Sequence, residues 1–405
     1  MTGSEEYSLT RRTMIAYIGS FIAGHLLGCA SVKDEDYLIA DRYIRSTLKV
    51  GKTPGIAVCV VRDDRIVWSA GYGWADIANR KPMTPDTIQN IASVSKTITT
   101  TAVMQLWEQA KLGLDDDVND YLRFSVRNPR YPDIPITFRQ LLTHTSSITD
   151  GPAFDAMYAC GDPTVSLMDW LQSYYEPAGS NYDAEKNFLP WPPGTLDPPR
   201  QISTYCNLAF GLLGGLVERI TGLYFAEYCR QKIFNPLGMN DTGWNLTDID
   251  VSRHAVPYGS APDPRVSPAA DTGNLSIDSK YYERCLYSFT NYPDGLLRTS
   301  VNDLSKFLRA YIGRGEFESV RILRESTVRT VLTESHDRQG LCWRRPRNVA
   351  GDSTIWGHDG GDPGVSTAMA FSQRQNKGVV VLSNYDGWDL VEEASKRLFQ
   401  ETADI

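Results

Sequence analysis

Short runs of apolar, β-branched residues lie near both ends of the chain and occur in pairs. Residues 55–61 and 66–70 form one pair, and residues 365–371 and 378–382 form another; a polar turn separates the two runs of each pair. Runs of this length and composition are typical of buried strands, and a polar turn between two of them is typical of a hairpin. The pattern predicts one mainly antiparallel sheet built from both ends of the chain.

A helical period replaces this pattern between the two hairpins. A long helix is expected from near Ser93 to residues 111–113, because apolar residues recur at helical spacing at Ile98, Ala102, Leu106 and Trp107. Further helical runs alternate with loops to about residue 290, and residues 390–399 fit an amphipathic closing helix. The loop Glu176–Arg200 holds six prolines and is too long for a passive connector. We expect it to border a site.

These elements predict an α/β fold of the α+β type: a mainly antiparallel sheet flanked by helices, with an inserted all-helical subdomain. The chain has 405 residues, of which 41% are hydrophobic, enough for a sizeable core. We expect a main domain at residues 30–405, with its α/β part at about 36–92 and 290–405 and its helical part at about 93–289. The net charge is −8 and the basic residues are scattered, which argues against a nucleic-acid partner.

The first 29 residues resemble an export signal rather than part of the fold. Arg11 and Arg12 precede an apolar stretch that ends in Leu26-Leu27-Gly28-Cys29. This order is typical of a twin-arginine signal that closes in a lipoprotein cleavage box, with Cys29 as the lipidated residue. It predicts an exported protein, periplasmic or anchored to a membrane through Cys29. The alternative is an N-terminal extension of a cytoplasmic protein.

The cysteines do not point to a metal. Seven are present, without a C-x-x-C pair or a Cys/His cluster. We therefore expect no metal site and no cofactor. Scattered cysteines at apolar positions are usually small core residues, and disulfides are possible in an exported protein. The sequence alone leaves their pairing open.

Ser93 and Lys96 are the first candidates for chemistry. Residues three apart on a helix share a face, so the lysine can reach the serine hydroxyl. A buried lysine that loses its proton can activate a serine as nucleophile, and burial favours the neutral amine. A helix start at Ser93 also directs backbone N–H groups at a developing oxyanion. The bland alternative is a helix cap followed by a surface lysine.

Tyr205 and Asn207 form a second candidate element between the proline-rich loop and a helical run. A phenol beside a cationic lysine can have its pKa lowered and can pass protons to a leaving group. The Asn207 amide could bind a substrate carbonyl and also hold Lys96. The alternative is a core tyrosine and a helix-capping asparagine.

The third element is the stretch 356–364, Trp-Gly-His-Asp-Gly-Gly-Asp-Pro-Gly. Gly360 and Gly361 allow a substrate backbone to approach a strand closely, and the Gly361 N–H could complete an oxyanion hole with that of Ser93. His358 would be a donor, a proton relay or an electrostatic partner. A glycine-rich turn with a structural histidine is the alternative.

In this order and spacing, the three elements resemble the penicillin-binding and β-lactamase superfamily. The Tyr-x-Asn element is similar to that of class C β-lactamases and the related D,D-peptidases and esterases, and the resemblance covers roughly residues 36–400. It implies a β-lactamase/transpeptidase-like fold. It also implies that Ser93 is the acylated nucleophile, that Lys96 and Tyr205 share the acid–base work, and that Asn207 binds substrate. His144 is expected to be structural.

One departure from that pattern narrows the expected substrate. Class C enzymes carry Lys-Thr-Gly at the third element, whereas this chain has His358-Asp359-Gly360, as esterases and D-amino-acid amidases of the family do. The resemblance therefore implies a serine hydrolase that cleaves an ester or amide of a small molecule or peptide. A β-lactamase or D,D-carboxypeptidase is the first alternative, and a non-catalytic penicillin-binding-like protein the second. Aromatic residues between Tyr158 and Trp191 are candidates for an apolar pocket.

Overall fold

A computed structural model describes residues 38–266, 281–346 and 354–400 of the chain. The predicted signal, with Cys29, lies outside the described residues. Residues 37–405 form one compact unit by their internal contacts.

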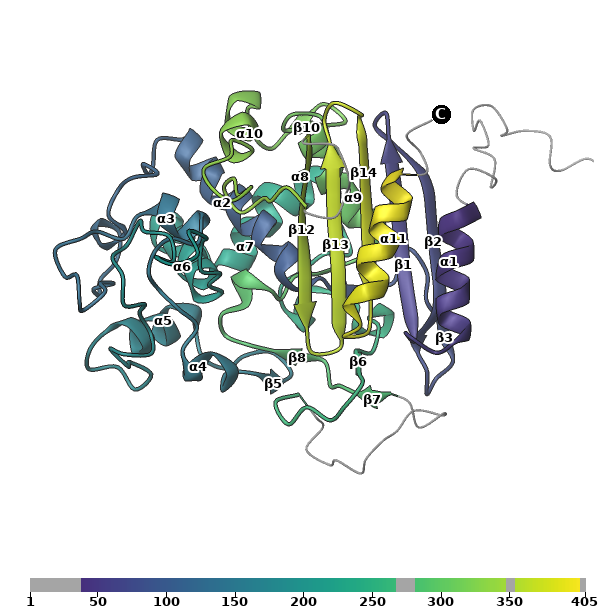
Figure 1. The fold of residues 1–405 in the computed structure, drawn as a ribbon, viewed down its shortest axis with the longest axis horizontal. Helices are drawn as coiled ribbons and strands as arrows, with labels where there is room; N and C mark the ends of the chain where they lie inside the picture. The colour runs from purple at the N-terminus through teal and green to yellow at the C-terminus, as the bar shows by residue number, and fades with distance from the viewer. Residues whose placement is uncertain (1–37, 267–280, 347–353, 401–405) are drawn as a thin grey trace, which may run out of the picture. The chain divides into compact units, whose positions relative to one another are not determined.

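The described residues form a six-stranded antiparallel sheet in the order β12-β13-β14-β1-β2-β3. Strands from the two ends of the chain meet at its centre, where Val58 of β1 faces Val381 of β14 (Figure 1). The predicted sheet is therefore confirmed. Its strands are β1 (Gly55–Arg62), β2 (Arg65–Asp76), β3 (Lys81–Pro82), β12 (Ile355–Asp362), β13 (Val365–Ser372) and β14 (Lys377–Ser383).

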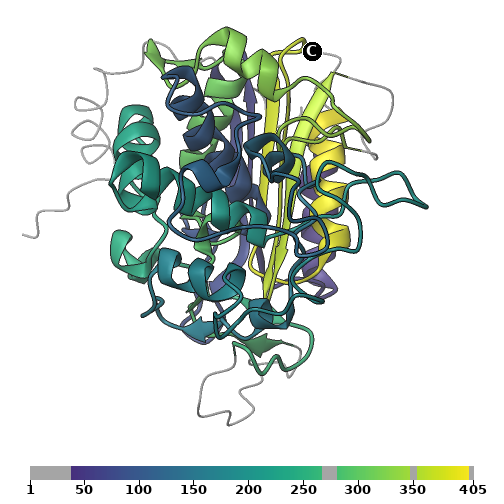
Figure 2. The same ribbon diagram turned by 90° about the vertical axis from the view of Figure 1, so that its left-hand side faces the viewer.

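Alternation along the strands creates a different core on each face of the sheet. Ile56, Val58 and Val60 pack with residues of α1 (Leu38–Lys49) and α11 (Trp388–Gln400), which cover one face. Ala57 and Cys59 point the other way, into the larger core. That second face carries α9 (Val301–Ile312) and the helical part of the molecule (Figures 1 and 2).

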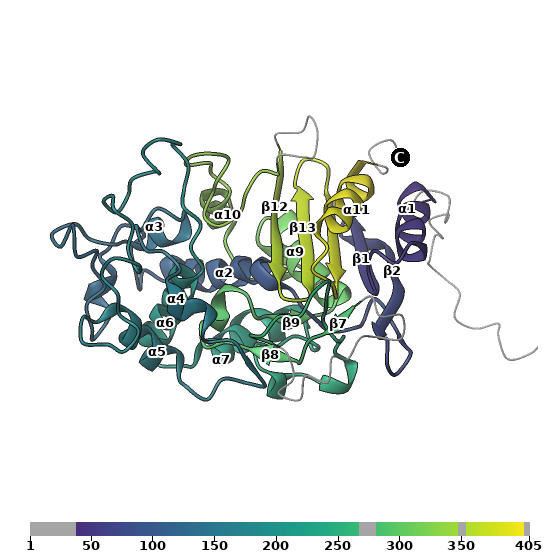
Figure 3. The same ribbon diagram turned by 60° about the horizontal axis from the view of Figure 1, so that its bottom comes forward.

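The helical part is built around two largely buried helices, α2 (Ser95–Glu108) and α6 (Leu208–Thr221), which pack against each other (Figure 3). The predicted helix from Ser93 is shifted. It begins at Ser95 after the 3₁₀ turn η2 (Ala92–Val94), and it ends at Glu108, before the expected stop. The shorter helices are α3 (Phe138–Leu142), α4 (Pro152–Asp155), α5 (Leu167–Tyr175), α7 (Phe225–Cys229), α8 (Asn235–Leu237) and α10 (Glu325–Val331).

A disulfide between Cys160 and Cys285 joins segments that are 125 residues apart in sequence. It lies beside the short strand pair of β5 (Ala159–Cys160) and β8 (Tyr287–Ser288). The other cysteines in the described ranges are buried free thiols, at positions 59, 206, 229 and 342.

No single helix of the described residues is long and apolar enough to cross a bilayer. The segments Leu208–Thr221 and Phe225–Leu237 reach that length and composition only together, and they bend by 78° between them.

Candidate active site

Ser93 lies in a turn whose backbone is fixed on both sides. Ala92 adopts a left-handed φ of +46°, which is unfavourable for a residue with a Cβ. Its N–H donates to Asn90 Oδ1 at 2.8 Å, and the Ile91 carbonyl accepts from the Thr367 hydroxyl at 2.8 Å. Ser93 is partly exposed while its neighbours are buried. The turn therefore presents the serine side chain at the surface of an otherwise buried segment.

Lys96 lies one turn further on, fully buried at 0% exposure. Its Nζ donates to Ser93 Oγ at 3.0 Å, to Asn207 Oδ1 at 2.7 Å and to the Asp294 carbonyl at 2.8 Å. The Asp294 carboxylate follows at 3.3 Å. Asp294 belongs to the 3₁₀ turn η7 (Tyr292–Asp294). The lysine thus links three segments that are far apart in sequence.

The charge state of Lys96 differs from the sequence prediction. Burial favours the neutral amine, but Tyr205 and Asp294 together outweigh it, and the pKa of Lys96 is raised. The effect of burial expected from the sequence is present, but these two groups outweigh it. Burial also raises the pKa of Asp294 to about 6, although Lys96 opposes that shift.

Asn207 is held at both ends of its amide. Its Oδ1 accepts from Lys96, and its Nδ2 donates to Asp150 Oδ2 at 2.8 Å. Asp150 Oδ1 also accepts from the backbone N–H groups of Asn207 and Leu208, at 2.9 and 3.0 Å, where α6 begins. Asp150 therefore caps α6 and positions Asn207, a role that sequence reasoning missed.

Tyr205 stacks on His144, with ring centroids 4.4 Å apart and planes at 30°. His144 Nδ1 accepts from the Cys206 N–H at 3.2 Å, and burial lowers the pKa of this histidine well below its usual value. It is therefore a neutral ring that positions Tyr205. Burial raises the pKa of Tyr205 even though Lys96 opposes it, so the lowered value expected from the sequence is not found.

Arg344 was not among the sequence candidates. Its guanidinium lies 4.9 Å from the centre of the Tyr205 ring, and its Nε donates to Gln339 Oε1 at 2.9 Å. Its backbone pairs with that of Gly357 on β12. The charge of Arg344 lowers the pKa of both Tyr205 and His358. A cation therefore lies near the third element even though the motif itself carries a histidine.

The glycines of the third element lie on β12 beside the Ser93 turn. A Cβ added to Gly360 would lie 2.9 Å from the Ser93 nitrogen and 2.7 Å from the Ile91 oxygen, so only glycine fits this approach. A Cβ on Gly361 would meet nothing within 4 Å. Gly361 instead lines the cavity at Ser93.

His358 is buried on the same strand, two residues before Gly360. Its Nδ1 lies 2.6 Å from the Asp359 carbonyl oxygen, and burial lowers its pKa to about 4, so the ring is neutral at pH 7. It lines a separate cavity of about 280 Å³, which it shares with Arg344.

The cavity at Ser93 measures about 130 Å³ and brings together most of the predicted site. Ser93, Tyr205, Asn207 and Gly361 line it, and Asp294 and Asp362 are there as well. Lys96 contacts Ser93 from behind this lining, whereas His358 lines the neighbouring cavity. The loop Glu176–Arg200 contributes no lining residue, contrary to the sequence expectation.

Three aromatic rings, those of Phe154, Tyr158 and Phe289, form one wall of this cavity. Tyr158 and Phe289 lie 4.8 Å apart between centroids, and the Tyr158 hydroxyl donates to Asp362 Oδ1 at 2.8 Å. Of the aromatic residues proposed from the sequence, Tyr158 lines the cavity. Others in that window belong to the core: Trp170, Tyr174, Tyr175 and Phe188.

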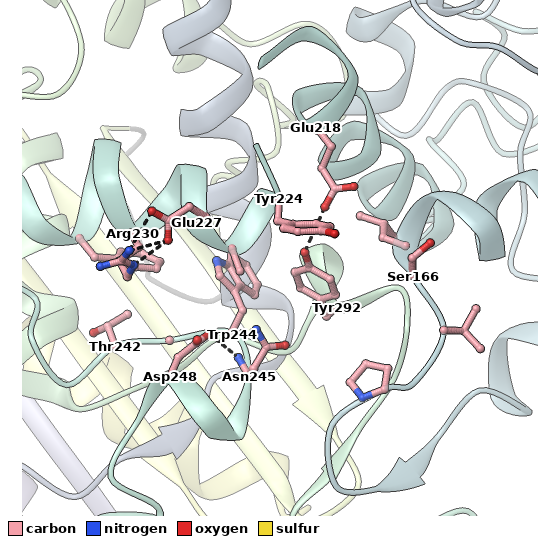
Figure 4. A pocket seen from close by; sticks show the side chains of 16 residues that line it. Ser166, Glu218, Tyr224, Glu227, Arg230, Thr242, Trp244, Asn245, Asp248 and Tyr292 are labelled. Atoms are coloured by element: carbon pink, nitrogen blue, oxygen red, sulfur yellow. Dashed lines mark hydrogen bonds and ion pairs between the residues drawn. The ribbon is translucent and has the colours of Figure 1, made fainter. Parts of the chain in front are cut away.

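A larger cavity of about 300 Å³ lies elsewhere, at Trp244. Figure 4 shows that its polar side chains bond to one another: Tyr292 to Glu218, and Arg230 to Glu227. Its serine, Ser166, bonds to Asp169 at 2.6 Å rather than to a basic side chain. This cavity therefore lacks the serine–lysine contact of the smaller one.

Known proteins resemble this chain along most of its length. The family model described as Beta-lactamase matches residues 40–402. The chain belongs to the β-lactamase family. The described residues hold no group of three or more His, Cys, Asp or Glu side chains placed to bind a metal ion.

Within this family, Protein flp of Staphylococcus aureus strain N315 is 22% identical over 357 residues, which cover 85% of this chain and 62% of that protein. The chain thus spans about three fifths of the flp sequence. The mitochondrial serine β-lactamase-like protein LACTB of Mus musculus is 43% identical over 263 residues, 51% of this chain and 46% of its own. The D-amino acid amidase of Ochrobactrum anthropi SV3 shares the fold: the TM-score is 0.70 at 19% identity, covering 91% of this chain and 98% of that one.

Proposed function

We propose that this protein is a serine hydrolase that forms an acyl-enzyme at Ser93 and cleaves an ester or an amide. The observation that carries the proposal is the 3.0 Å contact between Lys96 Nζ and Ser93 Oγ, at a cavity that Tyr205 and Asn207 also line. The fold shared with a D-amino acid amidase is consistent with amide cleavage.

The arrangement supplies each part of an acyl transfer. Ser93 Oγ attacks the carbonyl carbon, and its proton passes to the Lys96–Tyr205 pair, which returns a proton to the leaving alcohol or amine. When Lys96 is neutral, its two N–H groups can bond to Asn207 Oδ1 and the Asp294 carbonyl, and its lone pair is left for the Ser93 hydroxyl. The N–H groups of Ser93 and Gly361 would stabilise the oxyanion. Water then hydrolyses the acyl-enzyme and releases the acid.

The side chains that line the Ser93 cavity favour this reading over antibiotic hydrolysis, and the cation Arg344 lines the neighbouring cavity rather than this one. Two carboxyl side chains, Asp294 and Asp362, line the cavity, and Lys96 is already bonded within the protein. An anionic β-lactam would meet like charge there. His358, where class C enzymes have lysine, is neutral at pH 7 because burial lowers its pKa.

A fluorophosphonate probe tests the nucleophile. The wild-type protein should be labelled, and Ser93→Ala should not be labelled. Ser95→Ala is the matched control, because that serine is buried two residues away on α2. An unlabelled wild-type protein, or labelling that survives Ser93→Ala, would refute the proposal. For the substrate class, short p-nitrophenyl esters should be hydrolysed faster than nitrocefin; the opposite ranking would support the β-lactamase alternative.

A further inference from the structure

One carboxyl group in the wall of the Ser93 cavity has no part in the acyl transfer described above. Asp362 is the last residue of β12, two positions beyond Gly360, and therefore shares a strand face with the glycine that touches the Ser93 turn. Its Oδ1 accepts from the Tyr158 hydroxyl at 2.8 Å. Its Oδ2 is buried and has no hydrogen-bond partner within 3.5 Å among the described residues, although the Tyr287 hydroxyl is near enough to lower the pKa of this carboxyl group. A buried acceptor of this kind is costly unless a ligand satisfies it.

The cations nearest to Asp362 are bonded elsewhere. Arg265 lies over the Tyr158 ring and forms ion pairs with Asp155 and Asp263, both at 2.8 Å. Arg298 donates to the Tyr287 carbonyl at 2.7 Å and to Ser288 Oγ at 3.0 Å. Within the described ranges, Asp362 therefore has an acceptor oxygen without a partner in a cavity without a free cation.

The rings beside this carboxyl group suit a positive charge. Tyr158, Phe154 and Phe289 line the same small cavity, and aromatic faces attract ammonium groups. Because Ser93 and Asp362 line the same cavity of about 130 Å³, one small acyl fragment can place its carbonyl at Ser93 and a further group at Asp362.

We infer that Asp362 binds a protonated amine on the acyl part of the substrate, so that the site selects esters or amides of amino acids with a free amino group. This inference rests on the proposed hydrolase function. Asp362 takes no part in bond making. Ser93 Oγ bonds to the aminoacyl carbon, the alcohol or amine leaves with one proton, and water later releases the free amino acid.

The ionisation of Asp362 gives the selection a pH dependence. Burial raises the pKa of Asp362 to about 7, with Tyr158 opposing that shift. The preference for the free amine should therefore rise as the pH passes through 7 and fall again as the substrate α-amino group, with a pKa of about 8, loses its proton. The charged or titratable groups that face Asp362 are Tyr158, Asp294, Tyr287, Arg265 and Arg298.

The test compares alanine p-nitroanilide with its N-acetyl derivative, for both enantiomers of alanine. The measured quantity is the ratio of their kcat/KM values at about pH 7.5, between the pKa of Asp362 and that of the substrate α-amino group, referred to the concentration of probe-reactive Ser93. We expect the wild-type protein to prefer the free amine and Asp362→Asn to lower the ratio roughly 10- to 100-fold, the range for a charged hydrogen bond. Asp359→Asn makes the same charge change at an exposed position on the opposite strand face and should keep the wild-type ratio.

Two outcomes would overturn the inference: a wild-type preference for the N-acetyl substrate, or a ratio that Asp362→Asn leaves unchanged. Neither outcome touches the proposed hydrolase function, because hydrolysis of both substrates would still depend on Ser93. If the fluorophosphonate probe does not label Ser93 of the wild-type protein, the proposed hydrolase function itself is refuted.

Discussion

The cavity at Ser93 is less than half as large as the cavity at Trp244, about 130 against about 300 Å³. In the larger one the charged groups neutralise one another, as Arg230 and Glu227 do. In the smaller one a buried lysine contacts a serine, and the preceding alanine is held in a left-handed conformation. The size of a cavity is therefore a poorer guide to reactivity than two other features. One is a buried charged side chain, here Lys96, and the other is a residue in an unfavourable backbone conformation, here Ala92.

Among the variants considered, removal of the Lys96 amine should cause the largest loss of activity. Lys96→Met keeps much of the side-chain volume but removes the group that exchanges protons with Ser93. We expect kcat/KM for p-nitrophenyl acetate to fall roughly 100- to 10,000-fold. Steady-state kinetics measures the fall, with the thermal unfolding midpoint as the folding control. If kcat/KM falls by less than about tenfold, Lys96 does not act as the base for Ser93.

Removal of the Arg344 charge should cause the second largest loss of activity. Its positive charge lowers the pKa of Tyr205, so Arg344→Met should raise that pKa and shift the acid limb of the kcat/KM profile to higher pH. Well below the pKa of Tyr205 the loss should be roughly 2- to 30-fold, the range for a cation near an aromatic ring, and it should be independent of pH. It should shrink only as the pH approaches that pKa. Arg344→Lys should restore part of the activity. A loss that persists undiminished above the pKa of Tyr205 would contradict this role.

A smaller effect concerns stability. Asp362 has a folded-state pKa of about 7, above the usual value near 4 for an unfolded chain, so the folded state holds the proton more tightly. Stability from this group is therefore present at low pH and is lost as the pH rises through 7. Asp362→Asn should unfold at a higher temperature than the wild type at pH 8, with the difference absent at pH 4. If Asp362→Asn instead raises the unfolding temperature more at pH 4 than at pH 8, the predicted pH dependence is contradicted.

The smallest effect is expected in the larger cavity. Glu218 is partly buried and its pKa is raised by desolvation, so Glu218→Gln resembles its protonated form and keeps the oxygen that accepts from the Phe225 N–H. We expect kcat/KM to change by less than about twofold. If Glu218→Gln lowers kcat/KM as much as Lys96→Met does, the larger cavity rather than the Ser93 cavity is the active site.

The sheet could be predicted because its signal is local. The runs at 365–371 and 378–382 correspond to β13 and β14 within a residue or two, since each strand carries its own apolar pattern and its own turn. The helix start at Ser93 was shifted by two residues because the 3₁₀ turn depends on the left-handed Ala92. A local contact from Asn90 and a long-range contact from Thr367 to Ile91 hold that conformation, and the second is not visible in the sequence.

The candidate site was predictable where a short motif carries it, as for Ser93, Lys96, Tyr205 and Asn207. Its electrostatics were not predictable. The raised pKa of Lys96 depends on Asp294 as well as on Tyr205, and Asp294 is 198 positions away, so no local pattern links it to the lysine. Asp150 and Arg344 were missed for the same reason: each acts through a contact made only in the folded chain.

The disulfide between Cys160 and Cys285 has a consequence for changing this protein's specificity. It joins the segment that carries Phe154 and Tyr158 to the segment that carries Phe289, so the aromatic wall is one covalently linked unit made from two distant stretches of chain. A substitution that displaces one stretch will also displace the other, because the disulfide links them. A library aimed at new acyl groups should therefore vary residues 154–160 and 285–289 together. Screening in a reducing medium would sample a wall without its covalent link, held by the two-residue strand pair and by ring contacts such as that of Tyr158 with Phe289.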